Sequence, residues 1–165
     1  MESRAKILGH PAHPMLIVFP LGLLVMSCVF DALDLVNPRD EWATVSYWML
    51  VTGLAGGVVA AVPGWIDWSA IPSGTRAKSI GLYHGLGNVV MLGVFGASWF
   101  LRRENYTQPP ALAQYLSFGA IALGTVTAWL GGELVDRLGV GVDRGANLNA
   151  PHSLSGKPAD APRVG

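Results

Sequence analysis

Four long apolar segments dominate the chain, and each is about as long as a helix that crosses a lipid bilayer. They cover approximately residues 15–36, 43–65, 79–101 and 111–135. A membrane-spanning α-helix needs about 20 mostly apolar residues, because the hydrocarbon core is about 30 Å thick. Charged residues make up only 13% of the chain, against about 25% in soluble domains. We therefore predict four transmembrane helices.

The first apolar segment has an alternative interpretation as a signal peptide, because Arg4 and Lys6 precede it. It is longer than the apolar region of a typical signal peptide, and no small-x-small cleavage site precedes Asp31 and Asp34. We interpret it as a retained span.

The links between the spans are short: "NPRDE", "SAIPSGTRAK" and "RRENYTQPP". Links of this length make consecutive helices antiparallel neighbours. The sequence thus predicts an all-α fold, an integral membrane antiparallel four-helix bundle over residues 1–142, with both termini at one end. We call this the terminal end, and the other the loop end. Residues 143–165 are rich in Gly, Asn, Pro and Ser and predict a disordered C-terminal tail.

Basic residues predict the orientation in the membrane. Six lie near the spans at the terminal end and three at the loop end, namely Arg4, Lys6, Arg76, Lys78, Arg137 and Arg144 against Arg39, Arg102 and Arg103. The positive-inside rule therefore places both termini in the cytoplasm. The formal net charge of zero argues against nucleic acid as a partner.

The terminal end should also gather the residues that suggest chemistry. The four-helix topology brings together His10 and His13 before the first span, Asp67 after the second, His84 in the third and Glu133 at the end of the fourth. The loop end holds carboxylates but no histidine. This asymmetry predicts a binding site at the terminal end.

The two N-terminal histidines stand in "GHPAHP", each directly before a proline. A residue before proline favours extended geometry, so we expect His10 and His13 on a stretched segment and Pro14 at the first helical position. Residues three apart in a polyproline segment share an edge, about 9 Å apart, and both imidazoles could then reach one centre. The alternative is that His13 caps the helix and His10 is solvated.

His84 lies about five residues into its span, or about 8 Å along the helix axis. Ionisable residues at that depth are costly and are candidates for function. Asn88, one turn further, could orient the ring. The alternatives are a neutral His84 bonded to a neighbouring helix, Asp67 paired with a basic residue of the adjoining loop, and Glu133 paired with Arg137 on its own helix.

The segments "GHPAHPMLIVFPLGLL", "PGWIDW", "GLYHGLGN" and "WLGGELVDRLGVGV" together resemble a bacterial membrane-protein family known as domain of unknown function 2231. The resemblance covers roughly Leu8 to Val142. It implies a four-helix fold in the bacterial inner membrane, with some members fused to iron–sulfur or cytochrome modules, and it implies no established activity. The family's motifs match here at His10, His13, His84, Gly131, Gly132 and Glu133.

Three functional classes fit these features. The first is a redox role, in which His10, His13 and His84, with Asp67 and Glu133, hold haem b or a metal ion, iron or zinc, and pass electrons to a partner protein or quinone. The two carboxylates count against haem, whose propionates are already anionic. The second is a small permease or proton pathway, and the third is a structural anchor for a partner. No arrangement of nucleophile and base indicates catalysis, and enzymatic activity and homo-oligomerisation stay open.

Overall fold

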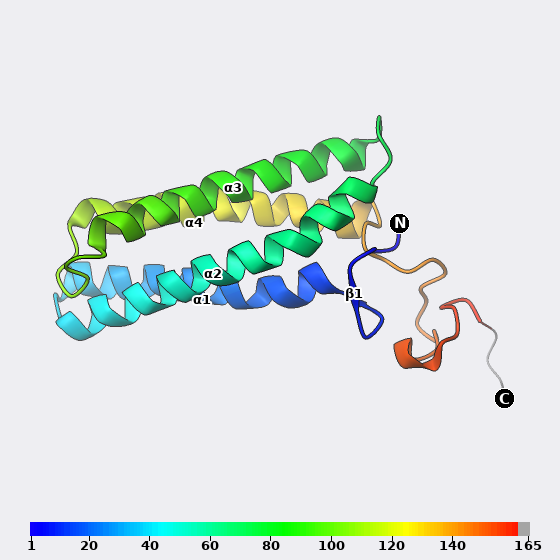
Figure 1. Ribbon diagram of the computed structural model, residues 1–165, viewed down its shortest axis with the longest axis horizontal. Helices are drawn as coiled ribbons and strands as arrows, with labels where there is room; N and C mark the ends of the chain where they lie inside the picture. Colours follow the sequence, from blue (N-terminus) through cyan, green and yellow to red (C-terminus); the bar gives the residue numbers. More distant parts are fainter. Residues whose placement is uncertain (162–165) are drawn as a thin grey trace.

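Four long helices form an antiparallel bundle, which confirms the predicted all-α membrane fold (Figure 1). The structure, a computed structural model, describes residues 1–161. The helices are α1 (Ala12–Val36), α2 (Asp40–Ala70), α3 (Arg76–Arg102) and α4 (Ala111–Gly132), and α4 continues as a π-helical turn, η1 (Glu133–Arg137). Helix α1 packs against α2, and α3 packs against α4, so the bundle consists of two helical hairpins.

Local sequence explains where the helices begin and end. The Thr75 hydroxyl accepts a hydrogen bond from the Lys78 backbone N–H at 3.2 Å and caps the start of α3. Asp40 and Glu41 occupy the first turn of α2, where carboxylates interact favourably with the helix dipole. The α1–α2 link is only Asn37 to Arg39, and Pro38 within it prevents α1 from continuing.

Burial is inverted relative to a soluble protein. The bundle interior holds small polar side chains beside an apolar cluster around Leu24, Leu50 and Phe95. The outer surface carries large apolar side chains, such as Trp65 and Trp129 with exposed fractions of 69% and 66%. All four helices are long and apolar enough to cross a membrane. An apolar exterior over most of the helix length is the surface that a lipid environment requires.

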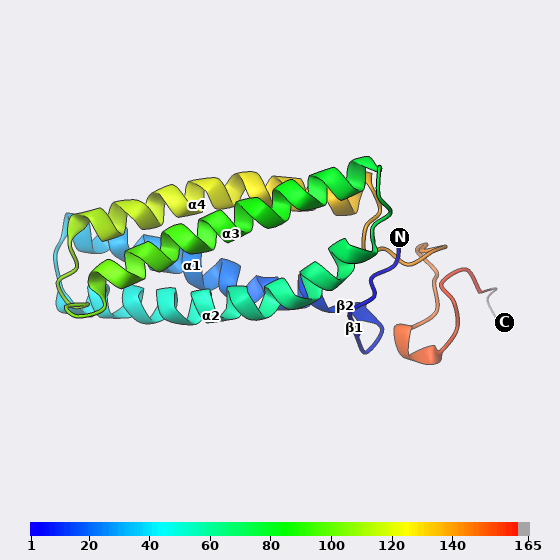
Figure 2. The same cartoon turned by 45° about the horizontal axis from the view of Figure 1, so that its top comes forward.

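The N-terminal segment and the segment that follows η1 lie side by side at the terminal end. A short antiparallel hairpin of β1 (Lys6–Ile7) and β2 (His10–Pro11) precedes α1 (Figure 2). The segment predicted to be disordered has defined positions as far as residue 161, including the 3₁₀ turn η2 (Ser153–Ser155). It contacts the N-terminal segment through the Lys6–Asp143 ion pair, at 2.6 Å. Residues 162–165, the remainder of the predicted tail, lie outside the described residues.

Candidate functional site

Two of the three predicted histidines lie side by side inside the bundle. His13 is in the first turn of α1 and His84 is in the third turn of α3, so each hairpin contributes one imidazole. The ring centroids are 6.3 Å apart, and the ring planes are nearly perpendicular, at 89°. Both side chains are partly buried.

Each imidazole is fixed by its Nδ1 atom. His13 Nδ1 lies 2.7 Å from the backbone carbonyl of Ala60 on α2, and His84 Nδ1 lies 2.8 Å from the carbonyl of Thr127 on α4. A carbonyl oxygen only accepts, so both Nδ1 atoms must be donors and both Nε2 atoms carry the lone pair when the rings are neutral. The geometry therefore selects one tautomer for each ring.

Glycines make room for this arrangement. Gly64 and Gly131 each lie four residues after the carbonyl that accepts from a histidine. A Cβ at Gly64 would come within 2.8 Å of His13 Nδ1, and one at Gly131 within 3.1 Å of His84 Cε1. Gly131 is therefore part of the site because a larger residue there would crowd the His84 ring.

The Nε2 atoms of the two rings differ in their surroundings. Asn88 donates from Nδ2 to His84 Nε2 at 3.1 Å, while Thr127 donates from Oγ1 to Asn88 Oδ1 at 2.7 Å. Together with the His84–Thr127 bond, these contacts close a ring of three hydrogen bonds. In the part of the chain that the structure describes, His13 Nε2 has no hydrogen-bond partner, so its lone pair is free.

His10 is not part of this pair. It is exposed in β2, where its Nε2 lies 3.3 Å from the Ser153 hydroxyl. The prediction of an extended His13 is wrong, because α1 already begins at Ala12 and His13 is helical. Pro14 is accepted within the first turn, where a helix leaves its backbone N–H groups without partners inside the helix. The helical turn directs His10 and His13 to different surroundings.

Asp67 holds the N-terminal segment in place. Its carboxylate accepts hydrogen bonds from the Ser3 hydroxyl at 2.7 Å, the Arg4 backbone N–H at 2.7 Å and the Ala5 backbone N–H at 3.2 Å. Among residues 1–161 it forms no ion pair with a basic side chain, and the two expected partners bond elsewhere, Lys78 to the Trp68 carbonyl and Arg76 to Glu133. The carboxylate is therefore occupied by the protein's own chain.

Glu133 forms an ion pair with Arg76, at 2.6 Å, and not with Arg137. This contact ties the end of α4 to the start of α3. Among residues 1–161, no group of three or more His, Cys, Asp or Glu side chains has an arrangement that could hold a metal ion. The structure thus brings together two of the five predicted ligands, His13 and His84, and places the other three in separate contacts.

The densest polar cluster lies at the loop end, where the sequence suggested no site. Arg102 donates from Nη1 and Nη2 to the two carboxylate oxygens of Asp31, at 2.8 and 2.9 Å. The hydroxyls of Ser46, Ser98 and Ser117 accept further bonds from the same guanidinium at 3.1, 2.8 and 3.2 Å. Both charged side chains are fully buried. Arg102 Nε is the buried side-chain polar atom without a partner among the described residues.

A pattern in the sequence could have revealed this cluster. Asp31 and Arg102 each follow a serine by four residues, Ser27 and Ser98, inside apolar segments. The sequence counts Arg102 as a basic residue at the loop end, whereas the structure buries it at the end of α3. Eighteen residues of α1 separate Asp31 from His13, or about 27 Å along the axis, so the two polar clusters are independent.

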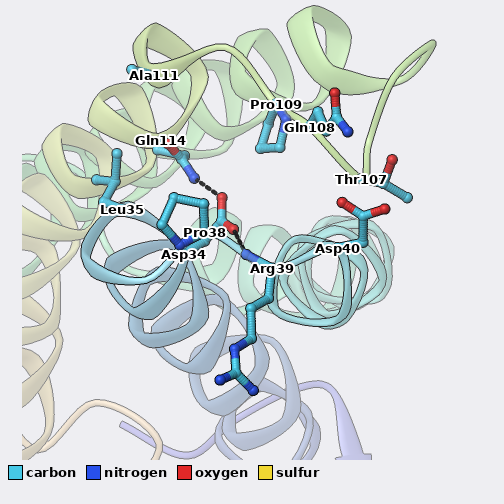
Figure 3. A pocket seen from close by; sticks show the side chains of 10 residues that line it. All are labelled: Asp34, Leu35, Pro38, Arg39, Asp40, Thr107, Gln108, Pro109, Ala111 and Gln114. Carbon is cyan, nitrogen blue, oxygen red and sulfur yellow. Dashed lines mark hydrogen bonds between the residues drawn. The ribbon is translucent and has the colours of Figure 1, made fainter.

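A pocket of ≈ 460 Å³ opens at the loop end, between the α1–α2 link and the segment that leads into α4 (Figure 3). Its inner wall holds Asp34 and Gln114, which point toward one another. Gln114 Nε2 donates to Asp34 Oδ2 at 2.7 Å, and the Arg39 backbone N–H donates to Oδ1 at 3.0 Å. Both oxygens of the carboxylate are thus occupied. The bond to Gln114 joins α1 to α4, and the bond from Arg39 holds the α1–α2 link against the end of α1.

Comparison with known proteins gives one match. The family described as "Predicted membrane protein (DUF2231)" matches residues 9–144, which include all four helices and both histidines of the pair. No curated protein and no solved structure matches the chain. The match spans most of the chain, and it confirms the resemblance seen in the sequence. The chain therefore belongs to the DUF2231 family of predicted membrane proteins.

Proposed function

We propose that this protein is a membrane electron-transfer protein that binds one haem b through His13 and His84. The observation that carries the proposal is the geometry of the pair. Each imidazole donates Nδ1–H to a backbone carbonyl, which is the usual arrangement of histidine ligands and leaves Nε2 as the atom that would bind a metal. This atom is free on His13, whereas on His84 it accepts from Asn88, whose amide would have to turn away for iron to bind. Two imidazoles bound to one metal ion at about 2 Å each have ring centroids about 6 Å apart. The observed 6.3 Å matches this spacing.

The number of ligands favours haem over a bare metal ion. Structural zinc needs four ligands and catalytic zinc three, whereas the pair offers two. Haem supplies four nitrogens of its own and requires only axial ligands from the protein. The carboxylates that argued against haem are bonded elsewhere, Asp67 to the N-terminal segment and Glu133 to Arg76. His10 and the two carboxylates are therefore left out of the proposed ligand set.

Such a haem would exchange single electrons at the terminal end. His13 belongs to the first turn of its span, so the site lies near one membrane surface, within reach of a partner protein or of a quinone. We place this surface on the cytoplasmic side of the bacterial inner membrane. Burial of Arg102 in an ion pair removes one of the three loop-end charges that opposed this orientation.

The test is haem retention by single variants. Protein produced with added haem precursor and purified in mild detergent should show the absorption of a low-spin haem, with about one haem per chain. His13→Ala and His84→Ala should lose the low-spin spectrum, whereas His10→Ala and His152→Ala, which change exposed histidines, should keep it. Wild-type protein that is folded but free of haem would refute the proposal, and so would full retention in both site variants.

A structural anchor is the second candidate, and the hydrogen bonds of His84 favour it. The ring formed by His84, Asn88 and Thr127 satisfies the imidazole without any cofactor. In that case His84→Ala would lower the stability of the bundle, but no haem would be present in any variant. Asn88→Ala separates the candidates further. It should weaken an anchor, while it leaves both Nε2 atoms available for iron.

A further inference from the structure

The two helical hairpins repeat one another at a constant spacing of 71 residues. This interval relates His13 to His84, Ser27 to Ser98, Ser46 to Ser117, and Asp31 to Arg102. The fully buried core residues Leu24 and Phe95 obey it as well. The first member of each of these pairs lies in α1 or α2, and the second member lies in α3 or α4 at the same depth in the bundle.

The contacts repeat together with the residues. Ser27 bonds to Ser46 at 3.1 Å within the first hairpin, and Ser98 bonds to Ser117 at 2.9 Å within the second. Both pairs are separated by 19 residues and fully buried. At the terminal end each hairpin has a histidine that donates to a carbonyl four residues before a glycine.

The hairpins differ in length by one helical turn. The histidine and its carbonyl partner are 47 residues apart in the first hairpin and 43 in the second. The difference lies between the serine pair and the terminal end, because the serine separation is the same in both. An extra turn in α2, which has 31 residues, accounts for it.

We propose that the chain is a tandem repeat of one helical hairpin, and that the inner face of each hairpin is an interaction surface for the unlike hairpin, taken from the same chain or from a second copy of the chain. The repeat axis runs along the bundle, between His13 and His84 at one end and between Asp31 and Arg102 at the other. Asp31 and Arg102 occupy equivalent positions with opposite charge. Pairing of two N-terminal hairpins would bury two carboxylates together, and pairing of two C-terminal hairpins would bury two guanidiniums. The charges therefore restrict pairing to unlike hairpins.

Exchange of the two charges tests the proposal. If the two hairpins are equivalent, the double variant Asp31→Arg/Arg102→Asp recreates the natural ion pair with the hairpins interchanged. The new arginine at position 31 would have three serine hydroxyls as hydrogen-bond acceptors, as Arg102 has in the natural protein. They would be those of Ser27, Ser46 and Ser117 in place of Ser98, Ser117 and Ser46. We expect each single variant to lose about 10 °C or more in thermal midpoint, and the double variant to recover most of it. Recovery should depend on the serines. Ser98→Ala should be more harmful than Ser27→Ala in the natural protein, and less harmful in the exchanged one.

A second measurement tests the proposal even if the double variant does not fold. The Asp31→Arg and Arg102→Asp chains, expressed together with different tags, can restore two Asp–Arg pairs by exchanging hairpins, and they should co-purify. Wild-type chains with the same two tags are the control and should not. The proposal is overturned if the exchanged chain is no more stable than the single variants and the single variants do not co-purify. It is also overturned if the exchanged chain folds and the order of the serine effects stays unchanged.

Discussion

Removal of Arg102 should be among the most destabilising single changes in this protein. The guanidinium donates five hydrogen bonds, two of them to Asp31, and its side chain has no exposed surface. In Arg102→Met, Asp31 would keep the Ser46 hydroxyl as its side-chain donor and would remain as a buried charge. Loss of one partner from a buried pair costs about 3–5 kcal/mol. At about 2–4 °C per kcal/mol for a chain of this size, the thermal midpoint should fall by about 10 °C.

Thermal unfolding in detergent, followed by size-exclusion chromatography after heating, measures this effect. The matched control is Asp31→Leu/Arg102→Met, which removes both charges and replaces them with apolar side chains. It should be close to wild type, because replacement of a whole buried ion pair is often neutral or stabilising. A loss below about 1 kcal/mol in Arg102→Met, or a double variant as unstable as the single one, would show that the pair is not buried in a dry interior.

Three further predictions concern the histidine pair, the terminal contacts and the topology. Gly64→Ala and Gly131→Ala should displace the imidazoles and lower haem content, whereas Gly119→Ala, where a Cβ would meet nothing within 4 Å, should be harmless; haem per chain after purification is the readout. Ion pairing with Asp143 raises the pKa of Lys6 above its ordinary value of 10.5, and bonding to Lys6 lowers the pKa of Glu2 below 4.5. The Lys6 ion pairs therefore stabilise the contact between the terminal segments below about pH 10.5, and this stabilisation is lost as the pH rises through the raised pKa. The contribution of Glu2 is present above about pH 4.5 and is lost as the pH falls through the lowered pKa. Hydrogen exchange of the terminal segments measures both effects, and it would show no change across this range if the ion pairs contribute nothing. Reporter fusions in the α1–α2 and α3–α4 links should report the periplasm and fusions in the α2–α3 link the cytoplasm, and the reverse pattern would invert the orientation.

The helices could be predicted from sequence because the bilayer sets their length and the links are short. The apolar segments give four spans within a few residues of α1 to α4, and α2 extends furthest beyond its prediction, to Ala70. The proximity of His13 and His84 also followed from chain direction alone. These features depend only on the hydropathy of the segments and on the length of the links between them, and both can be read from the sequence.

The remaining site residues depended on contacts that no periodicity encodes. Asp67 faces the folded N-terminal segment, and that segment's path over the bundle cannot be inferred from its composition. Glu133 has basic residues both on its own helix and on α3, and its pairing with Arg76 depends on how α3 packs against α4. His10 and His13 are close in sequence, but helix formation at Ala12 separates them.

The buried ion pair was missed because charges at span ends usually face water. The sequence places Asp31 among the loop-end carboxylates, whereas the structure buries it completely. The serine four residues before each charge is the signal that distinguishes an interior helix face from an interfacial one. Only the repeat between the hairpins relates the two serine–charge pairs to one another, and without it nothing in the sequence indicates that Asp31 and Arg102 are partners.

Electron paramagnetic resonance of the oxidised wild-type protein tests the central proposal most directly. Two axial imidazoles with ring planes at 89° should give low-spin ferric haem with the highly anisotropic signal that perpendicular ligand planes produce. That signal should account for about one haem per chain and should disappear in His13→Ala and in His84→Ala. A folded protein that carries no haem when haem is supplied, or one whose haem stays high-spin, would contradict the assignment of His13 and His84 as paired ligands.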